Sequence, residues 1–292
     1  MARAKKNPRR QEERYVSLRE RKRRRRSDFF ISILSLVCFG LIAFNLFGGR
    51  FALRGLTLTD LSTETLDFRT VDPLRRWHGE DMKIAYLTFN SGPSANVGQI
   101  LDVLAAEGVQ ATFFLQGDTI NANPQSQAAI RRIKEEGHAL GLQSMTHHSY
   151  LLYRQDGAPQ AFMDEMFEVQ QLIYDAAAYR PYLVRPPFGT PGNVSEEHVR
   201  LLAEAGMRVW DWHVDTGDWR AGITTEQMVG NVESGLARWG SPLDVIILFH
   251  EREITIEALP AVISYLRGQG YRFGIDNPQQ PLRMNLINSP DI

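Results

Sequence analysis

Residues 82–280 of this 292-residue chain predict an α/β fold built on a parallel sheet. Short apolar runs, which are typical of buried strands, alternate with amphipathic stretches that are typical of surface helices. Glycines follow several of these stretches, at the position where a left-handed residue often ends a helix. Repeating β–α units of this kind predict parallel strands that are covered by helices.

The apolar runs and the amphipathic stretches can be placed along the chain in order. The predicted strands are the runs at residues 84–89, 111–115, 209–210 and 245–249. The predicted helices lie at residues 98–107, at 195–202, after Thr225 and at 256–266. Ser195 is the expected cap of the second helix, because its hydroxyl can accept a hydrogen bond from a first-turn backbone N–H. The glycines expected to end helices are Gly108, Gly137, Gly206 and Gly270.

The N-terminal part of the chain has a different character. Residues 1–28 hold 13 Lys and Arg against four Asp and Glu, a local charge of +9, although the whole chain has a formal charge of −1. Residues 29–48 carry no charged side chain and, at about 1.5 Å per residue, are long enough to cross a membrane as a helix. The basic run at residues 21–26 predicts that the N-terminus is cytoplasmic and that the rest of the chain lies outside.

These features predict the organisation of the whole chain. It consists of a basic cytoplasmic tail (1–28), a single transmembrane helix (29–48), a stalk (49–81), the α/β domain (82–280) and a C-terminal tail (281–292). A cleavable signal peptide is the alternative for the apolar segment, but a long charged region precedes it and Phe, Leu and Asn crowd its far end. The basic tail is expected to contact the lipid bilayer rather than nucleic acid. The single cysteine, Cys38, excludes an intrachain disulfide and a cysteine-rich zinc site.

Polar and aromatic residues gather in five segments near the ends of predicted strands. In order they read Thr-Phe-Asn-Ser-Gly-Pro (88–93), Gln-Ser-Met-Thr-His (143–147), Arg-Pro-Pro-Phe-Gly (185–189), Asp-Thr-Gly-Asp-Trp (215–219) and Ile-Leu-Phe-His (247–250). In parallel β/α barrels the functional groups lie in the loops after the strands. The five segments therefore predict a single site at the carboxyl ends of the strands.

The five segments resemble, in the same order, the motifs of the polysaccharide deacetylase family, also called carbohydrate esterase family four. The resemblance covers about residues 82–275. It implies a distorted (β/α)7 barrel that removes acetyl groups from N-acetylglucosamine in chitin or peptidoglycan. It also implies a divalent metal such as zinc, which this family binds through one aspartate and two histidines.

Carried over residue by residue, the resemblance gives an incomplete catalytic set. It implies that His250 protonates the leaving amine, that Asp218 orients His250, and that Arg185 positions the general base. The base position itself holds Asn90, whose neutral amide takes up no proton.

The metal-binding set is reduced further. Of the three ligand positions only His147 is retained, because Ser91 and Gln143 stand at the other two. A hydrolytic zinc site needs about three protein ligands and an open position for water. We therefore expect no cofactor, although His148, next to His147, is a candidate for a replacement ligand.

The substrate-binding side of the site is retained. The resemblance implies that the backbone N–H of Phe188 points at the acetyl carbonyl and that Trp219, Ile247 and Phe249 form an apolar wall. Gly189 and Asp215 complete this set. The alternative is structural, with Trp219 packed inside the barrel and Arg185 paired with Asp215.

These observations predict a membrane-anchored protein of the cell wall whose catalysis is impaired and which binds N-acetylated glycan or a partner protein. One alternative is an active hydrolase that removes N-acetyl groups from peptidoglycan or chitin-like oligosaccharides. Another is a structural or signalling membrane protein. The expected partners are the lipid bilayer and N-acetylated cell-wall glycan, not nucleic acid, and the sequence does not indicate an oligomeric state.

Overall fold

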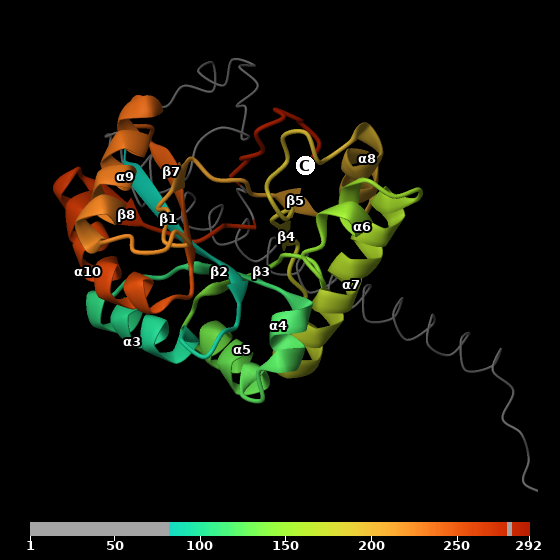
Figure 1. The fold of residues 1–292 in the computed structure, drawn as a ribbon, viewed down its shortest axis with the longest axis horizontal. Helices are drawn as coiled ribbons and strands as arrows, with labels where there is room; N and C mark the ends of the chain where they lie inside the picture. The colour runs from blue at the N-terminus through green and yellow to red at the C-terminus, as the bar shows by residue number, and fades with distance from the viewer. Residues whose placement is uncertain (1–81, 279–281) are drawn as a thin grey trace, which may run out of the picture. The chain divides into compact units, whose positions relative to one another are not determined.

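The computed structural model describes residues 82–278 and 282–292, which form the domain shown in colour in Figure 1. The predicted cytoplasmic tail (1–28), transmembrane helix (29–48) and stalk (49–81) lie outside the described residues. In the part of the chain that is described, no helix is both long enough and apolar enough to cross a membrane. The predicted membrane anchor therefore stays a prediction.

Eight strands form one parallel sheet. They are β1 Lys83–Gly92, β2 Thr112–Leu115, β3 Ala139–Leu142, β4 Leu183–Val184, β5 Arg208–Val209, β6 Val214–Asp215, β7 Asp244–His250 and β8 Tyr271–Phe273. The strands pair in the order β5-β4-β3-β2-β1-β7-β6, and β8 pairs with β1. The predicted parallel α/β fold is confirmed. Among the described residues no ladder joins β5 to β6, so the barrel is open at that place.

Helices surround the strands (Figure 1). They are α3 Val97–Glu107, α4 Gly117–Ala122, α5 Ser126–Glu135, α6 Ser149–Tyr153, α7 Ala158–Ala177, α8 Glu196–Glu204, α9 Thr225–Arg238 and α10 Glu253–Gly268. The four predicted helices correspond to α3, α8, α9 and α10. The helix α10 begins at Glu253, three residues before the predicted start at residue 256, and Pro260 lies in its interior.

The helix ends follow local side-chain chemistry. Ser195 precedes α8 and forms a capping box with His198, whose Nδ1 accepts a hydrogen bond from the Ser195 N–H at 3.2 Å. Thr224 caps α9 through a bond from the Gln227 N–H to its Oγ1 at 3.3 Å. The predicted left-handed glycines are confirmed, with φ values of 63°, 84°, 67° and 84° at Gly108, Gly137, Gly206 and Gly270.

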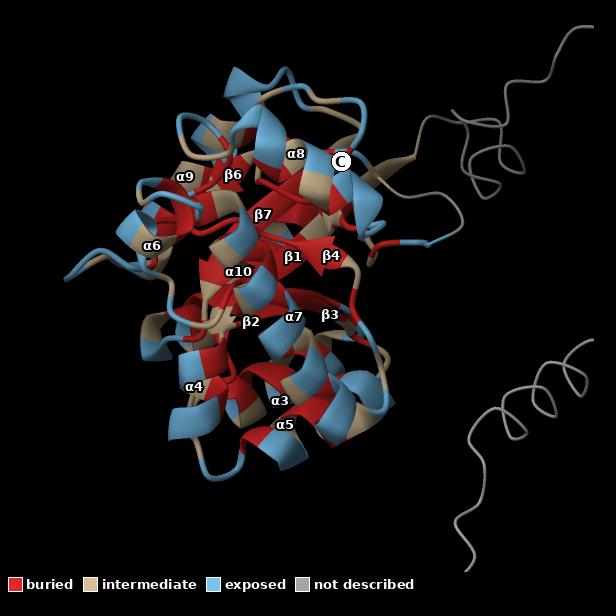
Figure 2. Cartoon of the chain, turned by 90° about the vertical axis from the view of Figure 1, so that its right-hand side faces the viewer, coloured by how far each residue is buried: buried red, intermediate tan, exposed pale blue. Residues whose placement is uncertain are grey.

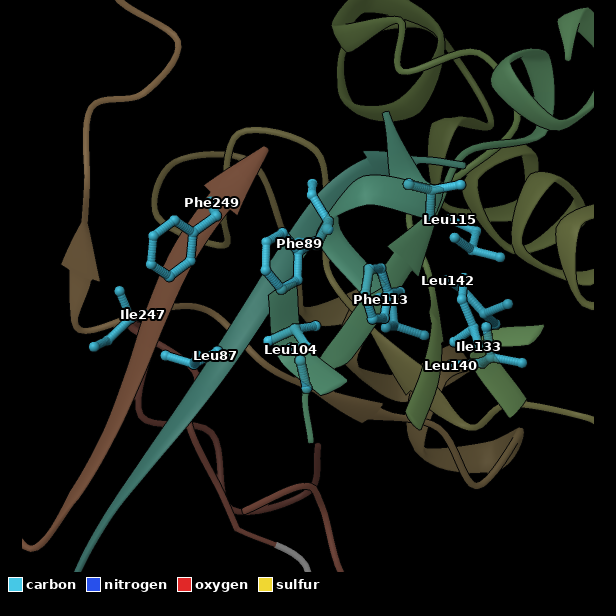
Figure 3. Close-up of a cluster of buried hydrophobic side chains, with 14 of the residues drawn as sticks. Leu87, Phe89, Leu104, Phe113, Leu115, Ile133, Leu140, Leu142, Ile247 and Phe249 are labelled. Atoms are coloured by element: carbon cyan, nitrogen blue, oxygen red, sulfur yellow. The ribbon is translucent and has the colours of Figure 1, made fainter. Parts of the chain in front are cut away.

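Successive residues of the strands face two different cores, because side chains alternate across a sheet. The outer core lies between the strands and the helices, and Figure 2 shows the buried strands beneath helices whose outward sides are exposed. Leu87 and Phe89 of β1 pack there with Leu104 of α3 (Figure 3). The Phe89 ring stacks on those of Phe113 and Phe249, with ring centroids 4.9 Å and 5.4 Å away.

The inner core fills the barrel. Its members include Phe114, Trp210 and Ile246, which come from three different places around the sheet. Gly141 of β3 makes room for Phe114, because a Cβ atom at Gly141 would lie 2.5 Å from the phenyl ring. This core closes the barrel from inside and leaves the carboxyl ends of the strands for function.

The C-terminal segment packs against the barrel. Trp210 donates a hydrogen bond from Nε1 to the carbonyl oxygen of Leu282 at 2.7 Å and forms a parallel bridge with Met284. Ile292 is fully buried, and its backbone oxygen accepts a bond from Asn285 at 3.0 Å. Residues 282–292, predicted as a C-terminal tail, therefore contribute to the packing of the domain.

Candidate active site

The five predicted segments meet at one edge of the sheet. Asn90 and His250 are register partners at the carboxyl ends of β1 and β7. The loops after β3, β4 and β6 reach the same edge because all the strands are parallel. Non-glycine residues with positive φ are uncommon and gather at functional sites. Four of them lie at this edge: Ser91 at the end of β1, Ser144 and His147 after β3, and Phe188 after β4, with φ values of 59°, 67°, 55° and 67°.

Arg185 contacts Asn90, the residue at the general-base position. It is fully buried, and its Nη1 donates to Asn90 Oδ1 at 2.9 Å and to Thr88 Oγ1 at 2.7 Å. Its other hydrogen bonds go to the backbone oxygens of Trp210 at 2.7 Å and Asp211 at 3.1 Å. All four acceptors are uncharged, so burial lowers the pKa of Arg185 to about 9, and the Asp211 carboxylate opposes the shift. The structure thus places Arg185 against Asn90, as the resemblance implies.

Asp211 is a buried carboxylate that sequence reasoning missed. It accepts hydrogen bonds from the N–H of Thr190 at 3.0 Å, from the Thr190 hydroxyl and from the N–H of Leu286 at 2.8 Å. It therefore joins the loop after β4, the end of β5 and the C-terminal segment around Arg185. An acidic residue directly after the apolar pair Val209–Trp210 was the available signal.

Asp218 and His250 form a hydrogen-bonded pair. His250 Nδ1 lies 2.8 Å from Asp218 Oδ1, and Asp218 Oδ2 accepts bonds from the His250 N–H and, at 2.8 Å, from the Thr255 hydroxyl. The Asp218 side chain is buried, whereas the His250 side chain is 26% exposed. Because Nδ1 is occupied by the carboxylate, Nε2 is the ring nitrogen available for proton transfer.

Of the three predicted metal positions, Ser91 lies at the end of β1, and Gln143 and His147 lie in the loop after β3. Ser91 donates from its N–H and its hydroxyl to Gln143 Oε1, at 2.6 Å and 3.3 Å. Together with His147 these residues offer one imidazole and two neutral oxygens, which does not fit the donor set of a hydrolytic zinc ion. Nowhere in residues 82–278 or 282–292 do three or more His, Cys, Asp or Glu residues gather in a way that could hold a metal.

His147 is half-buried and lies near both Phe188 and His250. Its ring meets the Phe188 ring edge-on, with centroids 4.6 Å apart. Burial is the main cause that lowers the pKa of His147, and the neighbouring His250 adds to the shift. The loop before it is held by Glu165 of α7, another residue that sequence reasoning missed, whose Oε2 accepts the Met145 N–H at 3.0 Å.

Trp219 and Phe188 are exposed at this edge. Trp219 is 48% exposed and Phe188 is 57% exposed, so the alternative that Trp219 packs inside the barrel is wrong. Asp215 accepts bonds from Trp219 Nε1 at 3.1 Å and from the Gly217 N–H at 2.8 Å. It orients the indole and does not pair with Arg185, whose acceptors are described above.

The loop after β4 presents a free backbone donor. Within the described residues the N–H of Phe188 has no acceptor, which suits a donor to a ligand carbonyl. Gly189 follows it with a φ of 80°, and a Cβ there would lie 3.2 Å from the Trp212 ring. Glycine at this position therefore allows the turn that exposes the Phe188 N–H.

The prediction that Ile247 and Phe249 wall the site is wrong. Both are fully buried and belong to the outer core beneath the helices (Figure 3). His250 faces the site, so alternation along β7 sends residues 247 and 249 to the opposite face of the sheet. Leu248 lies on the same face of β7 as His250, so it is the neighbour of His250 along this strand that faces the barrel interior.

The fold and the site together define a parallel-barrel protein with an imidazole–carboxylate pair, a buried arginine and a backbone donor at the carboxyl ends of its strands. A sequence model of the polysaccharide deacetylase family matches residues 79–210. The chain is 36% identical over 196 residues to YheN of Bacillus subtilis, which is named as a putative polysaccharide deacetylase, covering 66% of this chain and 67% of that protein. This chain belongs to the polysaccharide deacetylase family.

Two further comparisons agree with this assignment. A peptidoglycan-N-acetylglucosamine deacetylase of Bacillus cereus is 32% identical over 203 residues, covering 68% of this chain and 71% of the relative. The crystal structure of a Bacillus cereus polysaccharide deacetylase superposes with a TM-score of 0.65 and 29% identity, covering 72% of this chain and all of the other. The parallel barrel described above is thus the fold of the family.

One structural neighbour bears on the replaced positions. It is a mutant of a pseudoenzyme of carbohydrate esterase family four with restored enzymatic activity, with 25% identity and a TM-score of 0.57, covering 66% of this chain and 65% of the other. The family thus contains members described as pseudoenzymes, and at least one of them has had activity restored by mutation.

Family membership overturns the expectation that no cofactor is involved. The deacetylases of this family are metal-dependent, so family membership implies a divalent metal and not the absence of a cofactor. The residues at positions 91, 143 and 147 remain a poor match to that metal. A test of activity in this chain therefore requires arms with and without added divalent cation.

Proposed function

We propose that this protein binds N-acetylated cell-wall glycan and that its deacetylase activity is impaired. The amide of Asn90 carries the proposal, because it stands at the general-base position, 2.9 Å from Arg185 Nη1. An amide has no basic lone pair at neutral pH and cannot take a proton from water. Loss of general-base catalysis typically slows a reaction by about 10²–10⁴-fold.

The groups expected to hold a glycan are all present. The Phe188 N–H can donate to an acetyl carbonyl, and the exposed face of Trp219 can stack on a sugar ring. The His250–Asp218 pair can hydrogen-bond to a sugar hydroxyl. Relatives named as peptidoglycan-N-acetylglucosamine deacetylases support this class of glycan as the ligand.

Impairment is tested by measuring acetate release from N-acetylglucosamine oligomers. The wild type is compared with the triple variant Asn90→Asp, Ser91→Asp and Gln143→His, with and without added zinc or cobalt. Positions 91 and 143 are suited to this repair because their side chains already touch, at 3.3 Å. We expect background release from the wild type and metal-dependent release from the variant. Metal-dependent release by the wild type above background would reject impairment in favour of an active hydrolase.

Glycan binding is tested by calorimetric titration of wild type and Trp219→Ala with the same oligomers. Loss of the stacking surface should weaken binding by about tenfold, which corresponds to about 1.4 kcal/mol. Trp239→Ala is the matched control. Trp239 is similarly exposed, at 44%, but it follows the C-terminal end of α9, whereas Trp219 precedes the N-terminal end of this helix. Equal affinities of wild type and Trp219→Ala would favour the structural or signalling alternative.

The proposal includes the predicted membrane anchor. Residues 29–48 would span the bilayer, and the basic run at residues 21–26 would keep the N-terminus in the cytoplasm. A C-terminal alkaline phosphatase fusion, which is active only outside the cytoplasm, tests this topology. Replacement of residues 21–26 by neutral residues should reduce its activity. An inactive fusion of the unchanged chain would contradict an external domain.

A further inference from the structure

Glu251, directly after His250, is a buried carboxylic acid that the site described above does not use. It is 6% exposed, and its Oε1 atom has no hydrogen-bond partner within the described residues. Burial is the main cause that raises the pKa of Glu251 to about 7, although hydrogen bonds from Ser94 oppose the shift. Burying a polar atom without a partner costs stability, so packing alone does not account for this residue.

The Glu251 carboxyl does not replace the missing general base, because it lies on the wrong side of the sheet. Gly92 is on the outer face with its register partner Leu115, and a Cβ atom on Gly92 would overlap Glu251 Oε1. Asn90 is on the inner face with its register partner Phe114. The carboxyl therefore lies behind the end of β1, whereas a base acts in front of it.

Glu251 joins the loop after β1 (residues 93–96) to the end of β7. Its Oε2 accepts the Ser94 N–H at 2.5 Å. Its backbone oxygen accepts bonds from the Ser94 hydroxyl at 3.2 Å and from Asn96 Nδ2 at 3.1 Å. In the described part of the chain, the hydrogen bonds between this loop and the segment after β7 all end on Glu251.

The chain forgoes favourable local interactions to make this contact. Asn96 precedes α3, a position at which asparagine commonly accepts a hydrogen bond from a first-turn N–H. It makes no such cap here, and its amide donates to Glu251 instead. Position 92 accepts only glycine while Glu251 is in place. Departures from the locally favoured arrangement are expected where function fixes the position of a group.

The two segments that Glu251 joins carry opposite sides of the candidate active site. His250 directly precedes Glu251, and Asn90 and Ser91 lie at the end of β1, just before the loop. The register of β1 against β2 shifts between Asn90 and Gly92, and such a shift re-aims the side chains of a strand. The direction of the end of β1 therefore depends on what holds the loop that follows it.

We propose that Glu251 is a positioning residue that fixes Asn90 and Ser91 relative to His250. It acts from behind the sheet and touches neither a ligand nor the reacting atoms. The inference goes beyond the proposed function, because it concerns the geometry of the site whether or not a glycan is bound.

Amide hydrogen exchange of the full-length protein, read at single residues by NMR, tests this role. The reporter is the Ser91 N–H, which bonds to Gln143 Oε1 and not to Glu251. Its rate is compared with those of the β7 amides, which report unfolding of the whole domain. The variants are Glu251→Ala and Glu251→Gln, whose amide oxygen can still accept the Ser94 N–H.

Asp276→Ala is the matched control, because it removes a similar group from another place. Asp276 is 7% exposed and its Oδ1 also has no partner within the described residues. Its Oδ2 accepts a hydrogen bond from Tyr182, directly before the amino end of β4 and thus at the opposite edge of the sheet from the site.

Relative to β7, the Ser91 N–H should exchange at least about tenfold faster in Glu251→Ala than in the wild type. In Glu251→Gln and Asp276→Ala its relative rate should stay within about threefold of the wild type. An unchanged rate in Glu251→Ala would overturn the proposal. An equal acceleration in Asp276→Ala would also overturn it, since any buried carboxyl would then have the same effect.

A second measurement uses the triple variant Asn90→Asp, Ser91→Asp and Gln143→His with added zinc. Adding Glu251→Ala should lower kcat for acetate release by about 10–100-fold and change KM by less than about threefold, because a displaced group slows the reaction more than it weakens binding. Adding Glu251→Gln should restore kcat, and an unchanged kcat with Glu251→Ala would contradict the proposal. Hydrogen exchange is measured with positions 90, 91 and 143 unaltered, so it decides the role of Glu251 even when the triple variant is inactive, a failure that would concern only the proposed impairment.

Discussion

The substitution Asn90→Asp should stabilise the protein. Arg185 is fully buried with four uncharged acceptors, one of which is Asn90 Oδ1 at 2.9 Å. A carboxylate of the same shape would turn this bond into a charge-assisted one. Hydrogen bonds to charged groups contribute about 1.5–3 kcal/mol, compared with about 0.5–1.5 kcal/mol for neutral pairs. After the cost of burying the carboxylate, we expect a net gain of about 1 kcal/mol, or about 2–4 °C in Tm.

The pH dependence of this gain provides a second test. Arg185 should hold the pKa of the carboxyl introduced by Asn90→Asp below its unfolded value of about 3.9. A group with a lowered pKa stabilises the folded state above its unfolded pKa, and this stability is lost as the pH falls through the folded pKa. The advantage of Asn90→Asp over the wild type should therefore be complete at pH 7 and shrink progressively as the pH falls below about 3.9.

Urea unfolding followed by circular dichroism measures both effects. Asn90→Ala is the control, because it removes an acceptor from Arg185 and should cost about 1–3 kcal/mol. The reasoning is refuted if Asn90→Asp is as destabilising as Asn90→Ala at pH 7. It is also refuted if the stabilisation does not decrease between pH 7 and about pH 3.

Three further predictions concern other polar groups of the domain. Burial raises the pKa of Glu251 to about 7, so ionisation of this carboxyl above about pH 4.5 destabilises the folded state. In urea unfolding, the stability of Glu251→Gln relative to the wild type should therefore rise by up to about 3 kcal/mol between about pH 4.5 and 8, and a difference that does not change with pH would contradict this. Burial lowers the pKa of His213 to about 4, so the free energy of unfolding of the wild type should fall by about 1–3 kcal/mol as the pH drops from about 6.5 to 4. The fall should be smaller in His213→Gln, and equal dependence of the unfolding free energy on pH in the two proteins would reject the role of His213. Thr255→Val removes one of the three hydrogen-bond donors to Asp218 and should lower the free energy of unfolding by about 1–3 kcal/mol. Thermal unfolding measures this effect, and an unchanged Tm would contradict the prediction.

Much of the fold was predictable because its signals are local. The runs at residues 84–89 and 245–249 lie within β1 and β7, and the cap at Ser195 depends only on neighbouring residues. The two-residue strands β4 and β6 were not predicted, because two residues show no periodicity, whereas the equally short β5 was indicated by the apolar pair Val209–Trp210. The helix Ala158–Ala177 does have the spacing of buried residues that predicts a helix, and it could have been found.

The candidate site was predictable where a residue lies at a strand end, and less so where its role depends on distant contacts. The contact of Arg185 with Asn90 spans 95 residues and was expected only because of the family resemblance. Asp211 was missed because its partners, Thr190 and Leu286, lie far away in the sequence. The error at residues 247 and 249 was avoidable, since their odd-numbered spacing from His250 already places them on the opposite face of the strand.

The central claim is that the amide of Asn90 disables proton transfer at a site that keeps Arg185 and the Asp218–His250 pair. It is tested most directly by comparing acetate release from N-acetylglucosamine oligomers by two repaired variants, with and without zinc. One carries Ser91→Asp and Gln143→His and retains Asn90, and the other adds Asn90→Asp. The account predicts that with zinc the variant with all three changes is faster by about 10²–10⁴-fold, the usual contribution of a general base. Equal rates in the two variants would contradict it.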